Sequence, residues 1–263
     1  MIKVASECGV DYVKFQKRDN KLLLGDSYSK PHPVPHNSYG KSYGLHRDFL
    51  EFSFSQHYNL VKYCKKVGIK YSVSVWDINS AKEFCKGKYN LDYIKVPSAC
   101  NTNFELLKIL RDNFKKKIHI STGMTTRVEL SKIYNFFKKK NKQNKLIFYA
   151  CTSDYPVKHE DICLLEISNL KKKFPDIKDY AFSGHHLGIA IDNVAYSLGA
   201  NYIERHFTLD RTWKGTDHAA SLEPNGLKKL TRDLKNTFLA LRAKNKLGLI
   251  KAEKFQRKKL KYF

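Results

Sequence analysis

The chain has 263 residues, of which 42% are hydrophobic and 13% aromatic, an ordinary composition for a folded protein with a sizeable core. It carries 49 Lys and Arg residues against 25 Asp and Glu residues, so its formal net charge is +24. No stretch of the sequence reaches the roughly 18 consecutive apolar residues of a membrane span, and the first residues lack the pattern of a signal peptide. We therefore expect a cytoplasmic protein that has no membrane partner.

The basic residues fall mostly in lysine runs such as FKKKIH, FFKKKNKQNK and LKKKFP, at predicted helix ends or in loops. Lysine is favoured in the last turn of a helix, and solvated basic surfaces are common. No zinc finger, RNP-type aromatic strand or basic zipper accompanies these runs. We interpret the charge as a lysine-rich surface and expect no nucleic-acid partner. The six cysteines are scattered without a C-x-x-C pair, which favours reduced thiols.

One pattern repeats along the chain: a short strand rich in β-branched and aromatic residues, a polar loop and an amphipathic helix. Strands that alternate with helices indicate a parallel sheet joined by right-handed crossovers. The predicted strands cover residues 11–16, 69–75, 92–98, 117–122, 145–153, 179–185 and 201–208.

The opening MIKVASECGV has the pattern of the second half of a helix that leads into the first predicted strand. A helix without a preceding strand suggests a βα unit that has lost its strand, and restoring it gives the eight strands of a (β/α)8 barrel. We predict an α/β fold of this kind, a TIM barrel over residues 1–244 whose first strand lies outside this chain. A basic tail is expected over residues 245–263.

Two long segments, 17–50 and 209–225, interrupt the repeat. Each follows a predicted strand, on the side of the barrel that carries active sites. We expect substrate-binding loops there.

Polar residues collect where the predicted strands end. A single serine at such a place is usually a turn or a helix cap, but several serines and two lysines converging on one barrel mouth are unusual. Hydroxyls, helix N-termini and ammonium groups are the donors that a phosphate needs, so we infer an anionic, phosphorylated substrate. The strand-end residues are Lys14, Gln16, Ser74, Lys95, Ser98, Ser121, Thr122, Thr152, Ser153, Tyr155, Ser183, His185, His186, Glu204 and His206.

His185 and His206 end two successive strands. Adjacent barrel strands would place them side by side on the rim, where their imidazole nitrogens could share a divalent metal. Two ligands are fewer than a metal usually needs, so water, substrate or a carboxylate would have to complete the set. The alternative is that each histidine caps a loop by hydrogen bonding. His186 has the more structural position, because it begins the turn into the next helix.

A lysine inside an apolar strand can also act as a Schiff-base nucleophile, and Lys14 or Lys95 would serve. Two lysines surrounded by hydroxyls suit phosphate binding better than a desolvated amine. A Schiff-base pyruvate aldolase stays open as an alternative.

Linked motifs along nearly the whole chain, from residue 1 to about 240, resemble the sialic acid synthase family in order and spacing. Members of that family condense phosphoenolpyruvate with an N-acetylated hexosamine, release phosphate and form nonulosonic acids. The resemblance implies a (β/α)8 barrel, as the strand count does. The motifs are VKFQ (13–16), YIKVPSACN (93–101), HISTGMTT (119–126), YACTSDYPV (149–157), FSGHHLGIAI (182–191) and YIERHFTLDRTWKGTDHAASLEP (202–224).

The resemblance implies roles for particular residues. His185 and His206 would bind a divalent metal ion, Mn2+ or Mg2+, which would polarise the aldehyde oxygen of the open-chain sugar. Lys14, Lys95 and Tyr155 would act in catalysis, with the two lysines on the phosphate and carboxylate of phosphoenolpyruvate. The serines expected to bind the same substrate are Ser74, Ser98, Ser121, Ser153 and Ser183. The residues expected to contact the sugar are Gln16, Tyr155 and Asp217.

The expected reaction joins C3 of the enol to C1 of the sugar, adds water at C2 and expels phosphate. Positioning of the two reactants and neutralisation of their charge would supply most of the catalysis. The acceptor could be N-acetylmannosamine or a 2,4-diacetamido-trideoxyhexose.

The sequence also departs from the family pattern. Gly184 stands where the family usually has an aspartate, and Cys100 stands where many members carry a sugar-binding glutamate. The family's first strand, with its glutamate motif, has no counterpart here. The same is true of a small antifreeze-like domain that lends an arginine to the partner subunit. An impaired barrel that acts as a basic binding protein is therefore a second alternative, and a homodimer remains an option.

Overall fold

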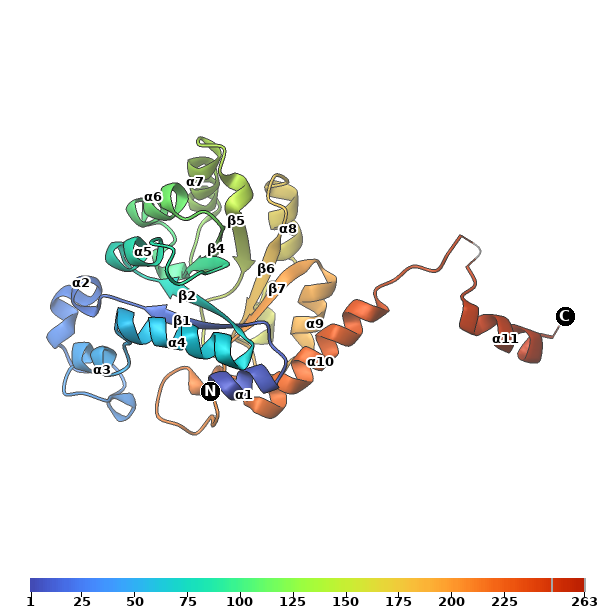
Figure 1. Cartoon of the computed structure of the whole chain (residues 1–263), viewed down its shortest axis with the longest axis horizontal. Helices are drawn as coiled ribbons and strands as arrows, with labels where there is room; N and C mark the ends of the chain where they lie inside the picture. The colour runs from blue at the N-terminus through green and yellow to red at the C-terminus, as the bar shows by residue number, and fades with distance from the viewer. Residues whose placement is uncertain (247, 263) are drawn as a thin grey trace.

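The computed structural model describes residues 1–246 and 248–262, and its centre is a curled parallel sheet surrounded by helices (Figure 1). In this part of the chain, seven strands pair in sequence order, each parallel to the next. Each predicted strand is confirmed, with shifts of a few residues at the ends. The strands are β1 (Tyr12–Lys17), β2 (Lys70–Val75), β3 (Tyr93–Val96), β4 (Lys117–Ser121), β5 (Leu146–Ala150), β6 (Tyr180–Gly184) and β7 (Ala200–Arg205).

Several helices begin at residues whose side chains cap them. Ser53 and Gln56 form a capping box at one helix start, and Thr126 and Glu129 form another. Asp77 and Asn103 cap two more through their side-chain oxygens. The helices are α1 (Ile2–Glu7), α2 (Asn20–Leu24), α3 (Tyr43–Phe49), α4 (Phe54–Val67), α5 (Ile78–Phe84), α6 (Phe104–Asn113), α7 (Arg127–Lys138), α8 (Glu166–Lys173), α9 (Ala190–Ser197), α10 (Pro224–Ala240) and α11 (Lys251–Leu260).

Alternation along the strands divides the interior into two layers. Residues such as Val73, Ile94 and Phe148 belong to the large core that includes the helices. The intervening residues fill the concave side of the sheet, where the ring of His119 stacks on Tyr93 with centroids 3.8 Å apart. Its Nδ1 lies 2.8 Å from the Tyr149 hydroxyl oxygen. An aromatic layer therefore closes the floor of the curled sheet.

The two edges of the sheet, β1 and β7, are bridged from outside by helices. Each edge strand pairs with one neighbour in the described residues. The Thr231 hydroxyl of α10 donates to the carbonyl of Cys8, next to α1, over 2.6 Å. The Cys8 thiol donates in turn to the carbonyl of Pro224 over 3.4 Å. The helices α1 and α10 are therefore in contact outside the gap between β1 and β7, although no described strand pairs across that gap.

Segment 17–50, expected as one long loop, contains the short helices α2 and α3. The expectation of a loop was therefore incomplete. The side chains of Asp19 and Ser42 cap these helices, because they accept hydrogen bonds from the backbone amides of Leu22 and Leu45. The segment reaches the second long segment, since the Tyr39 hydroxyl donates to the Lys214 carbonyl over 2.7 Å. Both segments therefore lie together at the C-terminal ends of the strands, as predicted.

Helix α11 stands apart from the rest of the molecule in Figure 1 and has no buried residue. It belongs to the predicted tail, of which residues 247 and 263 lie outside the described part. None of the helices within residues 1–246 and 248–262 is both long and apolar enough to cross a membrane.

Acid should destabilise this fold through His57, which is fully buried on α4 with its Nδ1 hydrogen-bonded to the Tyr71 hydroxyl. Burial, and then the charge of Lys17, lower the pKa of His57 to about 4, against about 6.5 when unfolded. The unfolded chain therefore binds the extra proton, so this stability is present above pH 6.5 and lost as the pH falls toward 4. Urea titrations across this range should show a shallower decline of the unfolding free energy for His57→Gln, by up to about 1.4 kcal/mol per pH unit. The exposed His36→Gln control should keep the parent slope, and equal slopes for all three proteins would contradict the prediction.

Candidate active site

Glu204 is the centre of a charged cluster inside the mouth of the sheet. Its Oε2 lies 3.6 Å from Lys14 Nζ, and its Oε1 pairs closely with Lys95 Nζ. The Ser183 hydroxyl donates to Oε1 over 3.1 Å, and Lys14 Nζ donates to the Ser74 hydroxyl over 3.0 Å. Five residues from five strands thus form one connected network.

Burial and charge set the ionisation of this cluster. Burial would raise the pKa of Glu204, but the charges of Lys14 and Lys95 outweigh it and hold that pKa below its usual range. Burial lowers the pKa of Lys14 to about 8, although Glu204 opposes the shift. At neutral pH two ammonium groups therefore share one carboxylate, which leaves a positive charge to attract an anion.

The two predicted histidines do come together. The ring centroids of His185 and His206 are 5.4 Å apart, and the ring of Tyr155 lies 4.2 Å from that of His185. Asp217 Oδ2 is 3.8 Å from Nδ1 of His206. Four of the five residues expected around the sugar and the metal therefore lie together on the rim near Glu204.

The imidazoles suit a metal ion in part. His185 Nδ1 donates to the Thr152 carbonyl over 2.8 Å, which leaves Nε2 with its lone pair. Burial lowers the pKa of His185 to about 4 and also lowers that of His206, so both rings are neutral, as metal ligands must be. Among the described residues, no group of three or more His, Cys, Asp or Glu side chains could hold a metal ion. The chain therefore offers two fitting nitrogen donors, and other ligands would have to complete the set.

A second group of hydroxyls surrounds Gly123. A methyl group on Gly123 would lie 2.3 Å from the Ser153 hydroxyl oxygen and 2.8 Å from that of Ser98, so only glycine fits between them. The thiol of Cys151 is 3.6 Å from the Ser98 hydroxyl. This cradle has the donors and the close backbone approach that a phosphate oxygen needs.

Two predicted residues stand outside these groups. Gln16 Oε1 accepts a hydrogen bond from the Arg18 guanidinium. The carbonyl of Ser121 accepts from the Asn101 amide over 2.8 Å, a bond that does not involve its hydroxyl. Both residues follow the inward alternation of their strands, but the structure gives no direct contact between either of them and Glu204.

Behind the histidines, a buried network fixes the turn that follows β6. The Arg205 guanidinium donates to Asp192 over 2.6 Å and to the carbonyls of His186 and Gly188 over 2.6 and 2.8 Å. His186 Nε2 lies 3.4 Å from Asp192, and both side chains are fully buried. His186 is thus structural in this arrangement, and Arg205 supports the backbone next to His185.

Gly184 belongs to the same network. A methyl group in its place would approach His186 Cε1 to 2.8 Å and Phe182 Cε1 to 2.9 Å. The aspartate usual in the resembled family therefore has no room here without movement of His186.

Sequence reasoning noted Glu204 as a strand-end residue but gave it no role, and it overlooked Arg18 and Gly123. The alternation E-x-H in YIERHFT places Glu204 and His206 on one face of β7 and could have pointed to Glu204. The environment of Gly123 depends on contacts with other strands, so no local pattern indicates it.

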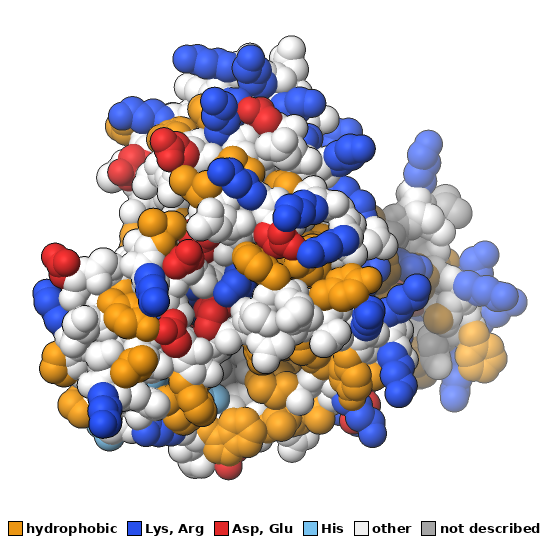
Figure 2. Space-filling view, turned by 60° about the vertical axis from the view of Figure 1, so that its left-hand side comes forward, with side chains coloured by type: hydrophobic (Ala, Val, Ile, Leu, Met, Phe, Trp, Pro, Cys, Tyr) orange, Lys and Arg blue, Asp and Glu red, His pale blue; other side chains and the backbone are white. Residues whose placement is uncertain are grey.

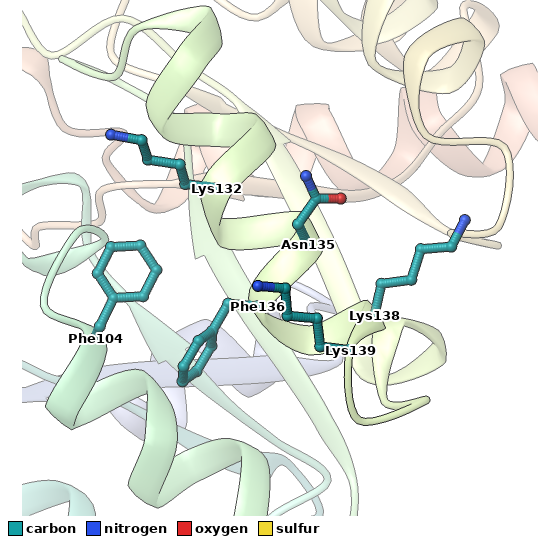
Figure 3. A pocket seen from close by; sticks show the side chains of 6 residues that line it. All are labelled: Phe104, Lys132, Asn135, Phe136, Lys138 and Lys139. Atoms are coloured by element: carbon teal, nitrogen blue, oxygen red, sulfur yellow. The ribbon is translucent and has the colours of Figure 1, made fainter.

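One surface hollow lies away from this mouth. A hollow of about 530 Å3 lies beside α6 and α7, with lysines around two phenyl rings (Figure 3). Its lining residues are Phe104, Lys132, Asn135, Phe136, Lys138 and Lys139. Figure 2 shows Lys and Arg side chains scattered over much of one face of the molecule, as expected for a lysine-rich surface.

Replacing Glu204 should be costly, because Glu204→Gln leaves two largely buried lysines without their carboxylate. We expect a loss of about 3 kcal/mol of unfolding free energy, the size of the effect for a broken buried pair. Denaturant titration measures it. Glu7→Gln, which removes an exposed pair with Lys3, is the matched control and should leave the midpoint unchanged. A Glu204→Gln variant as stable as the parent would refute the role given to this carboxylate.

Adding one methyl group at Gly184 should also destabilise the protein. Gly184→Ala is expected to lower the unfolding free energy by about 1–3 kcal/mol, because the His186 and Phe182 rings must move. Gly226→Ala is the control, since the nearest atom to its methyl group would be 3.5 Å away. Thermal unfolding of both variants tests this, and equal midpoints would argue against a tight packing around Gly184.

Comparison with known proteins identifies the family of the chain. A family model described as the NeuB family matches residues 1–246. Human N-acetylneuraminate-9-phosphate synthase is 40% identical over 240 residues, which cover 89% of this chain and 64% of that protein, so the chain spans less than two thirds of this relative. The N,N'-diacetyllegionaminic acid synthase of Campylobacter jejuni is 31% identical over 262 residues, covering 99% of this chain and 76% of that protein.

A solved structure also resembles the whole fold. It is the N-acetylneuraminic acid (sialic acid) synthetase of Leptospira borgpetersenii in complex with citrate, with a TM-score of 0.80 and 25% identity. The similarity covers 99% of this chain and 85% of that one. The resemblance read from the sequence motifs is thereby confirmed, and because the family match spans nearly all of the chain, the protein belongs to the NeuB family.

Proposed function

We propose that this protein is a nonulosonic (sialic) acid synthase, which condenses phosphoenolpyruvate with an N-acetylated hexosamine such as N-acetylmannosamine and releases phosphate. The observation that carries the proposal is the Glu204 network, in which Lys14 and Lys95 share one carboxylate at the mouth of the sheet beside His185 and His206. The names of the relatives, which are synthases of N-acetylneuraminate 9-phosphate and of diacetyllegionaminic acid, support the same class.

Phosphoenolpyruvate would bind in the charged part of the mouth. Lys14 and Lys95 would neutralise its phosphate and carboxylate, and the serine hydroxyls would donate hydrogen bonds to the same oxygens. The cradle around Gly123, formed by Ser98 and Ser153, is the best-shaped receptor for the phosphate. Ser74 and Ser183 hold Lys14 and Glu204, so these two serines would orient the charged groups. Ser121 would also bind phosphoenolpyruvate, because its position on β4 is on the face of the sheet that lines the mouth.

The sugar would lie on the rim. Gln16, Tyr155 and Asp217 would contact it, and Tyr155 would pack against the histidines on one side. Burial, and then the charge of Asp217, raise the pKa of the Tyr155 hydroxyl to about 12, so it stays protonated and can donate a hydrogen bond. Tyr155 would thereby help to position the sugar aldehyde for attack by C3 of phosphoenolpyruvate.

His185 would hold a divalent ion, Mn2+ or Mg2+, through the lone pair of Nε2, and His206 through one of its ring nitrogens. Such an ion supplies Lewis-acid polarisation of the aldehyde oxygen when it is bound. The Thr152 carbonyl orients His185 for this role, and the depressed pKa values of both rings keep them free of competing protons.

A Schiff-base pyruvate aldolase is the second candidate, and the pKa of Lys14, lowered by burial to about 8, favours it. Its pairing with Glu204 and Ser74 engages the same amine, which supports the synthase more strongly. A third candidate is an impaired barrel that acts as a basic binding protein. It would keep the positive charge at the mouth but would not convert the substrates.

Closure of the sheet into an eight-stranded barrel is part of the proposal. Lys14 on β1 and Glu204 on β7 face each other across the two sheet edges, while α1 and α10 are already in contact outside them. A further strand between β7 and β1, supplied from outside residues 1–263, would complete the ring.

We also propose that the protein works in the cytoplasm, which the six free cysteines support. The partners would be the two substrates, and we expect neither nucleic acid nor a membrane among them. The chain would form a homodimer, which light scattering would test. Residues 1–244 would form the catalytic barrel, and residues 245–263 a basic tail.

Phosphate release tests the main proposal. The chain is mixed with phosphoenolpyruvate and a panel of N-acetylated hexosamines, with Mn2+ or with chelator, and free phosphate is measured. We expect sugar-dependent release that disappears with chelator and in His185→Ala and His206→Ala. Borohydride with pyruvate should leave the activity intact. Inactivation by borohydride together with indifference to chelator would establish the aldolase, and sugar-independent or absent release from folded protein would reject the synthase.

The affinity for phosphoenolpyruvate should fall at alkaline pH. Lys14 is charged below its pKa of about 8 and neutral above it, so the positive charge that binds the substrate is lost between about pH 7 and 9. Calorimetric titration should show a Kd that rises with pH in the parent. In Lys14→Met the binding should be weaker throughout and nearly independent of pH over this range. A parent Kd that stays constant up to pH 9 would argue against a charged Lys14 in the site.

A further inference from the structure

We propose that Tyr149 is a positioning residue for phosphoenolpyruvate binding. Its ring holds the ammonium group of Lys95 in the mouth without neutralising it, so that Lys95 stays available to the anionic groups of the substrate. The inference rests on the proposed synthase function and deepens it. It adds a residue of the aromatic floor, on β5, to the parts of the chain that prepare the site for its substrate.

Lys95 is the more deeply buried of the two lysines at Glu204. Its side chain is 4% exposed, against 18% for that of Lys14. An ammonium group that has left water needs partners on several sides, because it has three N–H donors and a large cost of desolvation. Lys14 meets this need with the Ser74 hydroxyl and Glu204. Within residues 1–246 and 248–262, Lys95 Nζ has Glu204 Oε1 as its one hydrogen-bond partner, so a contact of another kind has to offset the rest of its desolvation.

The ring of Tyr149 supplies that contact. Lys95 Nζ lies over the ring, 4.1 Å from its centroid. The face of an aromatic ring is negative and attracts a cation, and the attraction is strongest where both groups are out of water. Tyr149 is almost completely buried. The ring therefore replaces part of the hydration that Lys95 has lost.

The ring differs from a second carboxylate because it carries no net charge. Burial, and then Tyr93, raise the pKa of the Tyr149 phenol, so the phenol stays protonated at neutral pH. Burial, and then the charge of Lys95, lower the pKa of His119, so the imidazole that contacts the phenol is neutral as well. The aromatic floor thus attracts Lys95 and leaves in place the positive charge that a substrate anion would meet.

Neighbouring rings fix the orientation of Tyr149. Its hydroxyl oxygen lies 2.8 Å from His119 Nδ1. The His119 ring is stacked on Tyr93 with centroids 3.8 Å apart and meets the Tyr202 ring at 4.8 Å. Tyr93, His119 and Tyr149 lie on the adjacent strands β3, β4 and β5. The ring face that Lys95 meets is therefore set before a ligand arrives, which lowers the entropy cost of binding.

The two lysines are thus held in different ways. A hydroxyl and a carboxylate hold Lys14 on β1, whereas an uncharged ring and a carboxylate hold Lys95 on β3. A change in the Tyr149 ring should therefore act on the substrate through Lys95. We expect the effect in the affinity for phosphoenolpyruvate, because the ammonium group is what meets the anion.

The test measures calorimetric binding of phosphoenolpyruvate, and its KM and kcat in the phosphate-release assay, for the parent and three variants. Tyr149→Phe keeps the aromatic face and should bind within about threefold of the parent. Tyr149→Leu removes the face and should raise Kd and KM by about tenfold, the size of a desolvated cation–π contact, with a smaller change in kcat. Tyr202→Leu, the same change in a ring that contacts His119 and Tyr93, is the control and should leave Kd unchanged.

Two further measurements separate positioning of Lys95 from packing of the floor. In a Lys95→Met background, Tyr149→Leu should change Kd by less than about twofold, because the cation that couples to the ring is gone. Phenylalanine analogues with one, two and three ring fluorines at position 149 keep the size of the ring nearly constant but weaken its negative face, so Kd should rise with each fluorine. Thermal unfolding shows which variants are folded, and the fluorinated series decides the question if Tyr149→Leu does not fold.

The outcomes for the two proposals are distinct. A Kd that is constant across the fluorinated series, or a loss in Tyr149→Leu that persists in full in the Lys95→Met background, overturns the positioning role and leaves the synthase intact. Binding that follows the predicted series, without sugar-dependent phosphate release, rejects the synthase and supports the positioning role. A folded parent that does not bind phosphoenolpyruvate overturns both.

Discussion

The pairing of Glu204 with Lys14 and Lys95 is the interaction on which the rest of the mouth depends. It connects the two edge strands, β1 and β7, with the inner strand β3, and all three side chains are largely buried. One carboxylate cannot neutralise two ammonium groups, so the site keeps a positive charge. A buried ion pair is seldom a source of stability, since desolvation of the ions offsets their attraction. Its retention here is better explained by the anion that the excess charge would attract.

Most of the fold follows from local patterns in the sequence. Each predicted strand is present because short runs such as YSVSV combine β-branched residues with a period of two. The same period sorts the side chains, with Val73 and Val75 toward the helices and Ser74 toward the mouth. Four of the predicted site residues, from four strands, therefore gather around Glu204 at one end of the sheet, and they are Lys14, Ser74, Lys95 and Ser183.

Other features depend on contacts between distant segments, and no local pattern predicts them. Arg18 is one of 49 basic residues in the sequence, and its stacking on Trp76 distinguishes it. The lack of space at Gly123 and Gly184 is set by side chains from other strands. The helices within segment 17–50 are short and polar, so the sequence shows no clear helical periodicity there. Their starts are defined by the caps at Asp19 and Ser42.

The placement of the two histidines depends on both a local sequence pattern and contacts between distant segments. Their positions at the ends of successive strands predicted that they would meet, and their rings are 5.4 Å apart. What holds them is non-local: a carbonyl from the segment after β5 orients His185, and Arg205 fixes the turn behind it. The binding of a metal ion by this pair remains a proposal that the neutral state of both rings supports.

A crystal structure of the chain with phosphoenolpyruvate bound would test the central claim most directly. The account predicts the phosphate and carboxylate against Lys14, Lys95 and the hydroxyls around Gly123, with Glu204 still paired with both lysines. Phosphoenolpyruvate bound elsewhere on the basic surface, with the Glu204 cluster empty of ligand, would contradict it.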